Sequence, residues 1–185
     1  MFSGTSTGAM LVSPIAYKKM SGHDLVHTLF TLKNIKKMFS KSWIDRIFGS
    51  VQFRPKYSAS GKRSIITENA SDLKIFDTDK ACLITGYNVS EHEARFFKSY
   101  GYNTDVYLRD VLDVSSAAPS FFPSVKYNDN GTVKYGIDGG IVGLNPTDCA
   151  YVDALKLWPN EEIRVLSISL GCEKFSKKNG PDSLF

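Results

Sequence analysis

The sequence lacks any apolar run long enough to cross a bilayer, and its 185 residues contain no internal repeat. Its first residues also lack the charged and apolar regions of a secretory signal, so we expect a chain that is cytoplasmic or peripheral at a membrane. No Cys-x-x-Cys pair occurs, which argues against a zinc or redox site. Cys82, Cys149 and Cys172 lie in apolar segments, and we expect them to be buried free thiols in a reducing compartment.

Acidic residues are scarce in the first third of the chain. Residues 1–63 contain eleven Lys and Arg but only Asp24 and Asp45, so this segment has a net charge of +9 although the whole chain has +4. Aromatic side chains such as Phe39 and Trp43 are interspersed among these cations. Such a segment suits either an anionic membrane surface or core helices whose lysines face solvent, and we favour core helices because the apolar positions fit a core stripe. We expect no nucleic-acid partner.

Histidine is also rare, and its positions limit the serine chemistry that the chain can use. His23 and His27 are four residues apart on an expected helix, but no third ligand is evident, so we expect surface side chains and no metal or cofactor. No histidine follows His92, so the order Ser, Asp/Glu, His of the α/β-hydrolases is not met. A serine esterase or peptidase with His92 as its base is the weakest alternative that we consider.

The N-terminal segment contains a Gly-x-Ser-x-Gly motif made of Gly4, Thr5, Ser6, Thr7 and Gly8. This motif is typical of the nucleophile elbow, in which a serine occupies a strained turn between a strand and a helix. Glycines flank the serine at positions where side chains are expected to collide with the turn. A flexible N-terminal loop would have a similar composition, so the motif needs support from the rest of the chain.

The apolar periodicity predicts alternating helices and strands. We expect helices over 9–20, 24–39, 43–48, 108–118 and 145–158, and strands over 81–89, 94–97, 133–137 and 163–170. Residues 54–63 are expected to form a loop, and their Gly-Lys pair does not match the spacing of a phosphate-binding loop. Strands that alternate with helices predict an α/β fold, with a mainly parallel central sheet in a three-layer α/β/α arrangement.

A second candidate for chemistry lies at the end of the strand expected over 133–137. Asp138 is followed by Gly139 and Gly140, which would let another chain segment approach closely. Active-site residues of open α/β sheets occupy such positions, although Asp-Gly-Gly is also common in tight turns. Together with the elbow, this placement makes Asp138 a better candidate base for Ser6 than any histidine.

Four segments, in this order, resemble the patatin-like phospholipase family. They are the elbow at residues 4–9, the stretch from Ser115 to Pro123, the Asp-Gly-Gly motif at 138–140 with Asn145-Pro146, and residues 167–171. The resemblance covers residues 2–171, and residues 83–100 also look like the family. It implies hydrolysis of acyl lipids by a Ser-Asp dyad, in which Ser6 attacks the ester carbonyl of a phospholipid or other acyl lipid and Asp138 takes the proton of Ser6.

The resemblance also implies an oxyanion hole. The N–H of Thr7, next to the nucleophile at a helix N-terminus, is one candidate donor. Members of the family have a first strand and a glycine-rich oxyanion loop before the elbow, and this sequence has no room for either. We therefore expect a patatin-like domain over 1–172, as a fragment or an N-terminally short member, and a loose polar tail over 173–185. The alternative is a catalytically impaired remnant that binds membrane or lipid through its basic aromatic N-terminal segment.

Overall fold

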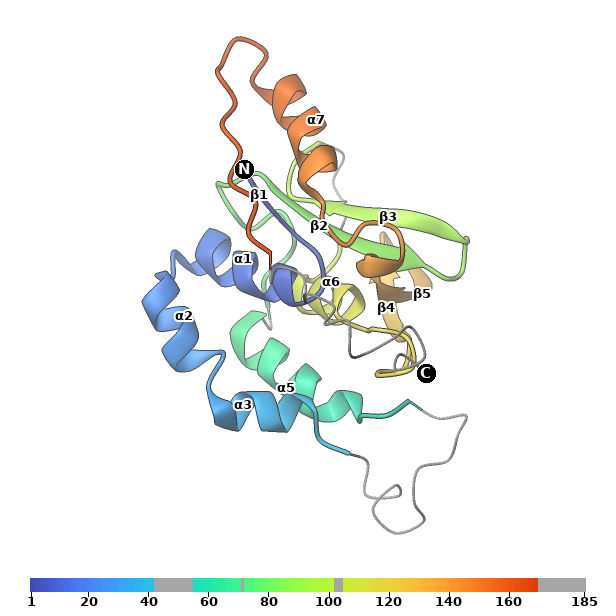
Figure 1. Cartoon of the computed structure of the whole chain (residues 1–185). Coiled ribbons are helices and arrows are strands. Elements are labelled where there is room, and N and C mark those ends of the chain that lie inside the picture. Colours follow the sequence, from blue (N-terminus) through green and yellow to red (C-terminus); the bar gives the residue numbers. More distant parts are fainter. Residues whose placement is uncertain (42–54, 71, 102–104, 170–185) are drawn as a thin grey trace, which may run out of the picture.

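The centre of the fold is a buried strand, β2 (Cys82–Asn88), in a computed structural model that describes residues 1–41, 55–70, 72–101 and 105–169 (Figure 1). Along one side of β2 runs the antiparallel strand β3 (Glu93–Lys98). Two strands share the other side: β1 (Phe2–Gly4) runs parallel to the first part of β2, and β5 (Thr132–Asp138) runs antiparallel to its last part. The strand β4 (Val125–Asp129) then pairs with β5.

The α/β class is confirmed, but the described sheet is mixed rather than mainly parallel. Three of its four strand pairings are antiparallel, and the β1–β2 pairing is parallel. Two of the antiparallel pairings follow from the length of the connections, because turns of a few residues join β2 to β3 and β4 to β5, and a parallel crossover needs a dozen residues or more. Asn130 and Gly131 both have positive φ, which a two-residue hairpin turn requires.

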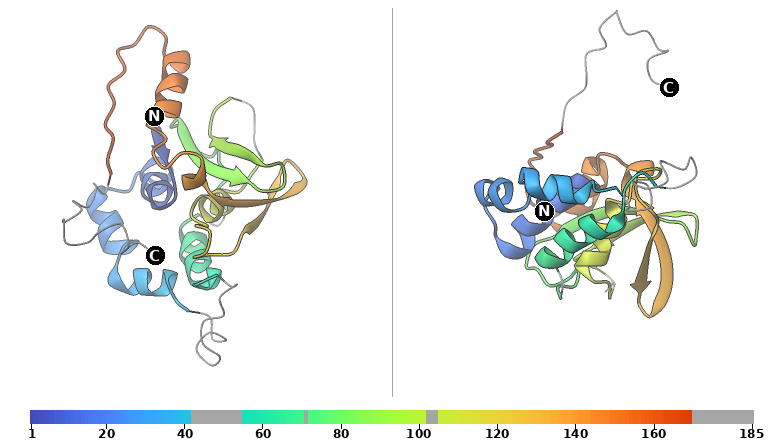
Figure 2. Two further views of the ribbon diagram at one scale, coloured as in Figure 1. Left: turned by 45° about the vertical axis from the view of Figure 1, so that its right-hand side comes forward. Right: turned by 90° about the horizontal axis from the view of Figure 1, so that it is seen from below.

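Helices cover both faces of the sheet, as the expected layered arrangement requires (Figures 1 and 2). Successive side chains of β2 point to opposite faces. Ile84 belongs to the main core, which the sheet forms with helices on one face, whereas Leu83 faces a single helix on the other. The helices of the core face are α1 (Thr7–Lys18), α5 (Ala59–Ala70) and α6 (Leu108–Ser115), and the single helix is α7 (Thr147–Leu157).

The helix α6 shows how the sequence specifies this core. Leu108, Val111, Leu112 and Ser115 follow the i, i+3, i+4, i+7 spacing of one helix face, and all four are buried. Three of them are apolar and pack into the core cluster. The fourth residue, Ser115, carries a polar hydroxyl at a position where an apolar side chain would be expected.

The helix expected over 24–39 is wrong, because the structure forms two shorter helices there. They are α2 (Gly22–Thr28) and α3 (Leu32–Met38). Ser21 and Thr31 cap them, since each hydroxyl accepts a hydrogen bond from the backbone N–H three residues later. Leucine and isoleucine continue at helical spacing across the break, so periodicity alone could not reveal it.

The structure confirms most of the other predicted helices and strands, but not all of them. The helices that follow residues 9, 108 and 145 and the strands near 81, 94 and 133 are confirmed. The loop expected over 54–63 is wrong from Ala59, where α5 begins, and described residues 163–169 form no strand because no neighbouring strand pairs with them. Cys82 is buried as expected, but Cys149 is exposed on α7. The expectations for 43–48, Cys172 and 173–185 lie outside the described residues.

Candidate active site

Ser6 lies on the turn between β1 and α1, in the strand–turn–helix context that the elbow motif requires. Its backbone has φ 56° and ψ −122°, a strained conformation for a residue with a side chain. A Cβ atom at Gly4 would lie 2.6 Å from the Ala9 nitrogen and from the carbonyl of Gly8, so close backbone approach requires glycine at this position. At Gly8 a Cβ would meet nothing within 4 Å, and the collision expected there is therefore wrong.

The register of the sheet brings the C-terminal ends of β1 and β5 to the same part of β2, on either side of one residue. Gly4 is paired with Ile84 and Asp138 with Gly86, and both pairings lie on the side of β2 that β3 does not occupy. Because β1 runs parallel and β5 antiparallel to β2, the two strands run head to head and stop on either side of one β2 residue. Two steps along a strand put the Cα atoms of Gly4 and Asp138 about 7 Å apart.

That one residue, Thr85, contacts the segments that follow both strands. Its hydroxyl lies 2.6 Å from the hydroxyl of Thr5, which itself donates to the carbonyl oxygen of Gly143 at 2.8 Å. A Cβ at Gly139 would lie 2.2 Å from the Thr85 hydroxyl oxygen and 2.5 Å from its carbonyl. The close approach expected after Asp138 is thus confirmed at Gly139, and the partner that approaches is Thr85.

The end of α6 binds the backbone of both candidate catalytic residues. The Ser6 N–H donates to Ser115 Oγ at 3.0 Å, and the Asp138 N–H donates to the carbonyl oxygen of Ala117 at 3.1 Å. Ser115 is completely buried, and its hydroxyl explains why a polar residue interrupts the apolar face of α6. The turn from Ser115 to Ala117 therefore connects Ser6 and Asp138, since it accepts the backbone N–H of one with a side-chain hydroxyl and that of the other with a carbonyl oxygen.

The Asp138 carboxylate is fixed by its own turn. Only 5% of the residue is exposed, and its Oδ1 accepts a hydrogen bond of 2.7 Å from the Gly140 N–H at the start of the short 3-10 helix η1 (Gly139–Ile141). Thr7 is the first residue of α1, where a backbone N–H has no acceptor within the helix. This N–H is therefore able to donate to a bound anion, and the role of Thr7 as an oxyanion donor stays a prediction.

The histidines lie elsewhere. His23 and His27 are exposed on α2, where their rings stack with centroids 4.1 Å apart. His92 is exposed in the turn between β2 and β3, beyond the end of β2 that pairs with β5. Within the ranges that the structure describes, no group of three or more His, Cys, Asp or Glu side chains is arranged to hold a metal ion.

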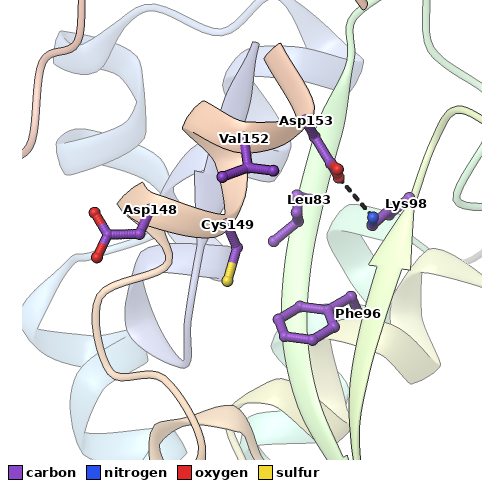
Figure 3. Close-up of a pocket in the computed structure, with 7 residues that line it drawn as sticks. All are labelled: Leu83, Phe96, Lys98, Asp148, Cys149, Val152 and Asp153. Atoms are coloured by element: carbon purple, nitrogen blue, oxygen red, sulfur yellow. Dashed lines mark ion pairs between the residues drawn. The ribbon is translucent and has the colours of Figure 1, made fainter. Parts of the chain in front are cut away.

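A groove of about 350 Å³ separates α7 from the sheet (Figure 3). An ion pair of 2.5 Å between Lys98 of β3 and Asp153 of α7 closes one side of it. Neither Ser6 nor Asp138 lines this groove, although its floor residue Leu83 is on the same face of β2 as Thr85. The full lining is Leu83, Phe96, Lys98, Asp148, Cys149, Val152 and Asp153.

Comparison with known proteins identifies the family of this chain. A model of the family described as patatin-like phospholipase matches residues 1–151. The chain belongs to the patatin-like phospholipase family. Similar proteins include Patatin-like protein 4 of Arabidopsis thaliana, which is 27% identical over 158 residues, covering 80% of this chain and 39% of that protein.

Two further patatin-like relatives cover more of the chain. Patatin-like protein 2 of Oryza sativa subsp. indica is 24% identical over 201 residues, which are 92% of this chain and 50% of that protein. Probable inactive patatin-like protein 9 of Arabidopsis thaliana is 25% identical over 196 residues, which are 96% of this chain and 51% of that protein. This patatin-like chain therefore spans about half, or less, of the length of the curated relatives it matches.

Two residues that bind the segments around the candidate site of this patatin-like chain were not identified as site residues from the sequence. Thr85 lies inside a run of apolar strand residues, and nothing in its spacing marks it. Ser115 lies in a segment that resembles the family, but that resemblance assigned it no role. The available signal for Ser115 was a hydroxyl on the buried face of an amphipathic helix.

Proposed function

We propose that this chain is a lipid acyl hydrolase that cleaves a carboxylic ester of a phospholipid or other acyl lipid with a Ser6–Asp138 dyad. The observation that carries the proposal is the head-to-head arrangement of β1 and β5, whose ends lead directly to Ser6 and Asp138. Membership of the patatin-like phospholipase family supports the reaction class.

In the proposed reaction, Ser6 Oγ attacks the ester carbonyl carbon while the Asp138 carboxylate takes the hydroxyl proton. The tetrahedral intermediate collapses to an acyl-serine, and Asp138 returns the proton to the leaving alcohol. Water then attacks the acyl-serine while Asp138 takes a proton from it, and Asp138 returns this proton to Ser6 Oγ as the fatty acid leaves. A carboxylate is a weaker base than an imidazole, so this chemistry depends on close positioning and on partial exclusion of water, which the burial of Asp138 supports.

The developing oxyanion is stabilised in this proposal by the Thr7 N–H at the N-terminus of α1. The Ser6 N–H does not serve this purpose, because it already donates to Ser115 Oγ. A single oxyanion donor contributes about a hundredfold to a thousandfold in turnover.

The test uses the purified 185-residue chain, a fluorophosphonate probe and phospholipid–detergent mixed micelles. We expect Ser6→Ala to abolish labelling and fatty-acid release, and Asp138→Asn to slow both by about a hundredfold or more, as loss of a general base does. Ser60→Ala and Asp79→Asn, which alter an exposed serine and an exposed aspartate, should behave as wild type. Circular dichroism of every variant separates lost chemistry from lost folding.

Equal labelling of wild type and Ser6→Ala would refute the dyad. A folded wild-type chain that neither reacts with the probe nor releases fatty acid would refute the hydrolase.

The second candidate function is binding to an anionic lipid surface through α2 and α3. Val26, Leu32, Ile35 and Phe39 are exposed apolar side chains there, Leu32 with 76% of its surface exposed, and exposed lysines at 33, 36 and 37 lie among them. Exposed apolar and cationic side chains together are the pattern of peripheral membrane helices. No helix in the described ranges combines the length and the apolar character needed to cross a membrane.

Co-sedimentation with vesicles tests this second function. We expect binding to phosphatidylglycerol vesicles that weakens with salt, is lost in Lys33→Glu/Lys36→Glu, and is unchanged in Ser6→Ala. Lys126→Glu, on β4, changes an exposed lysine elsewhere and serves as the control. Failure to bind at low salt would refute it.

A further inference from the structure

A buried lysine on α5 contacts the end of α6. Lys62 is 3% exposed, and three oxygen atoms surround its Nζ: the Asp113 carbonyl oxygen at 2.9 Å, Asp113 Oδ1 at 3.0 Å and Ser116 Oγ at 3.1 Å. The ammonium also lies 4.8 Å from the centre of the Phe122 ring. Lysines are almost never this buried without partners, so the site is specifically built to hold a cation.

The charges around Lys62 come from three elements. Asp113 on α6 is the ion-pair partner, and its Oδ2 also lies 2.7 Å from Arg63 of α5. The third charged group is Asp138, at the end of β5, whose charge also acts on the ammonium. Burial lowers the pKa of Lys62 below its ordinary value, and the Asp113 carboxylate opposes that change.

Lys62 contacts the middle of the turn that connects the proposed dyad. Ser115 Oγ accepts the N–H of Ser6, Ala117 O accepts the N–H of Asp138, and the residue between them, Ser116, is held by Lys62. The Ser116 hydroxyl also donates to the carbonyl oxygen of Leu112, so this turn is tied both to α6 and to α5. A movement of the turn would therefore displace both ends of the dyad at once.

On the basis of the dyad proposed above, we propose that Lys62 is a positioning residue for the reaction. Its ammonium fixes the turn at 115–117 and thereby sets the separation between Ser6 and Asp138. Lys62 does not touch the substrate in this arrangement and acts through Ser116.

The test compares Lys62→Met, Lys62→Arg and the exposed-lysine control Lys126→Met in the full chain. Lys62→Met should lower kcat about 10- to 100-fold with little change in KM, because small displacements of reacting groups have effects of this size. Lys62→Arg keeps a charged hydrogen-bond donor at this position and should restore part of kcat, and Lys126→Met should match wild type.

A second variant and a second measurement test the same role of Lys62 independently of whether Lys62→Met is active. Ser116→Ala leaves Lys62 in place but removes the hydroxyl that contacts both Lys62 and the Leu112 carbonyl oxygen, so it should also lower kcat. Hydrogen exchange reports positioning without any turnover: in Lys62→Met the amides of Ser6 and Asp138 should exchange at least tenfold faster than in wild type. If wild type proves inactive, the hydrolase proposal fails, whereas the exchange result still decides whether Lys62 holds the turn.

A folded Lys62→Met with wild-type kcat and wild-type amide exchange at Ser6 and Asp138 would overturn the inference. If Lys62→Met does not fold, unchanged kcat and unchanged Ser6 and Asp138 amide exchange in Ser116→Ala would overturn it instead.

Discussion

Gly4→Ala should destabilise the chain, whereas Gly8→Ala should not, although both glycines belong to the same motif. A Cβ at position 4 would lie 2.6 Å from three backbone atoms of residues 8 and 9. These atoms belong to the first turn of α1 and cannot move away without opening the elbow. A Cβ at position 8 meets nothing within 4 Å, and alanine is a better helix former than glycine at this second residue of α1.

The two substitutions should therefore have different effects on stability. Forcing an extra methyl group into a closely packed site costs about 1–3 kcal/mol. For a chain of this size each kcal/mol corresponds to about 2–4 °C in Tm, so Gly4→Ala should lower Tm by about 2–12 °C. Gly8→Ala should leave Tm unchanged or raise it, since alanine is favoured over glycine in a helix by about 0.5–1 kcal/mol.

Thermal unfolding followed by circular dichroism, with urea titrations as a second measure, gives both values on the purified variants. The reasoning would be refuted if Gly4→Ala melted at or above the Tm of wild type. It would also be refuted if Gly8→Ala were destabilised as much as Gly4→Ala, because close approach would then not distinguish the two positions.

Three further predictions test other parts of the structure. Burial raises the pKa of Cys82 to about 12, so iodoacetamide at pH 8 should alkylate the exposed Cys149 and leave Cys82 unmodified until the chain unfolds, as mass spectrometry would show. Burial opposes ionisation of Asp153, yet its hydrogen bond from Lys98 holds the pKa of Asp153 below its usual range. Wild type should therefore have a higher urea midpoint than Asp153→Asn at pH 6, and this difference should shrink as pH falls through the lowered pKa of the folded state. Gly61→Ala would place a Cβ 1.9 Å from a carbonyl oxygen of α3, so it should lower Tm by separating α3 from α5, and an unchanged Tm would contradict that contact.

Local sequence patterns predicted those helices and strands whose apolar spacing lies within a single element. The i, i+3, i+4 spacing of α6 and the short apolar run of β2 each specify one element, and the structure forms both. The break between α2 and α3 escaped prediction because apolar periodicity continues through it, while the caps at Ser21 and Thr31 end and restart the helix. The alternation over 163–170 predicted a strand, but a strand also needs an edge to pair with, and the sequence does not say whether one is available.

The sequence by itself determined the two candidate catalytic positions. A serine between glycines at an expected strand–helix turn and an aspartate before two glycines are local signals, and Ser6 and Asp138 could be chosen from them. It also indicated why glycine stands at positions 4 and 139, because close approach of backbone leaves no space for a side chain.

The tertiary structure alone decided how these positions relate. The register on β2 sets β1 and β5 head to head. If either strand were shifted along β2 by one residue, the distance between their ends would change by about 3.3 Å. Thr85, Ser115 and Lys62 acquire their roles from contacts with segments far away in the chain, which no local pattern records. The physical reason is that spacing along the chain specifies which face of an element is buried, whereas the partner of that face depends on how all the elements pack together.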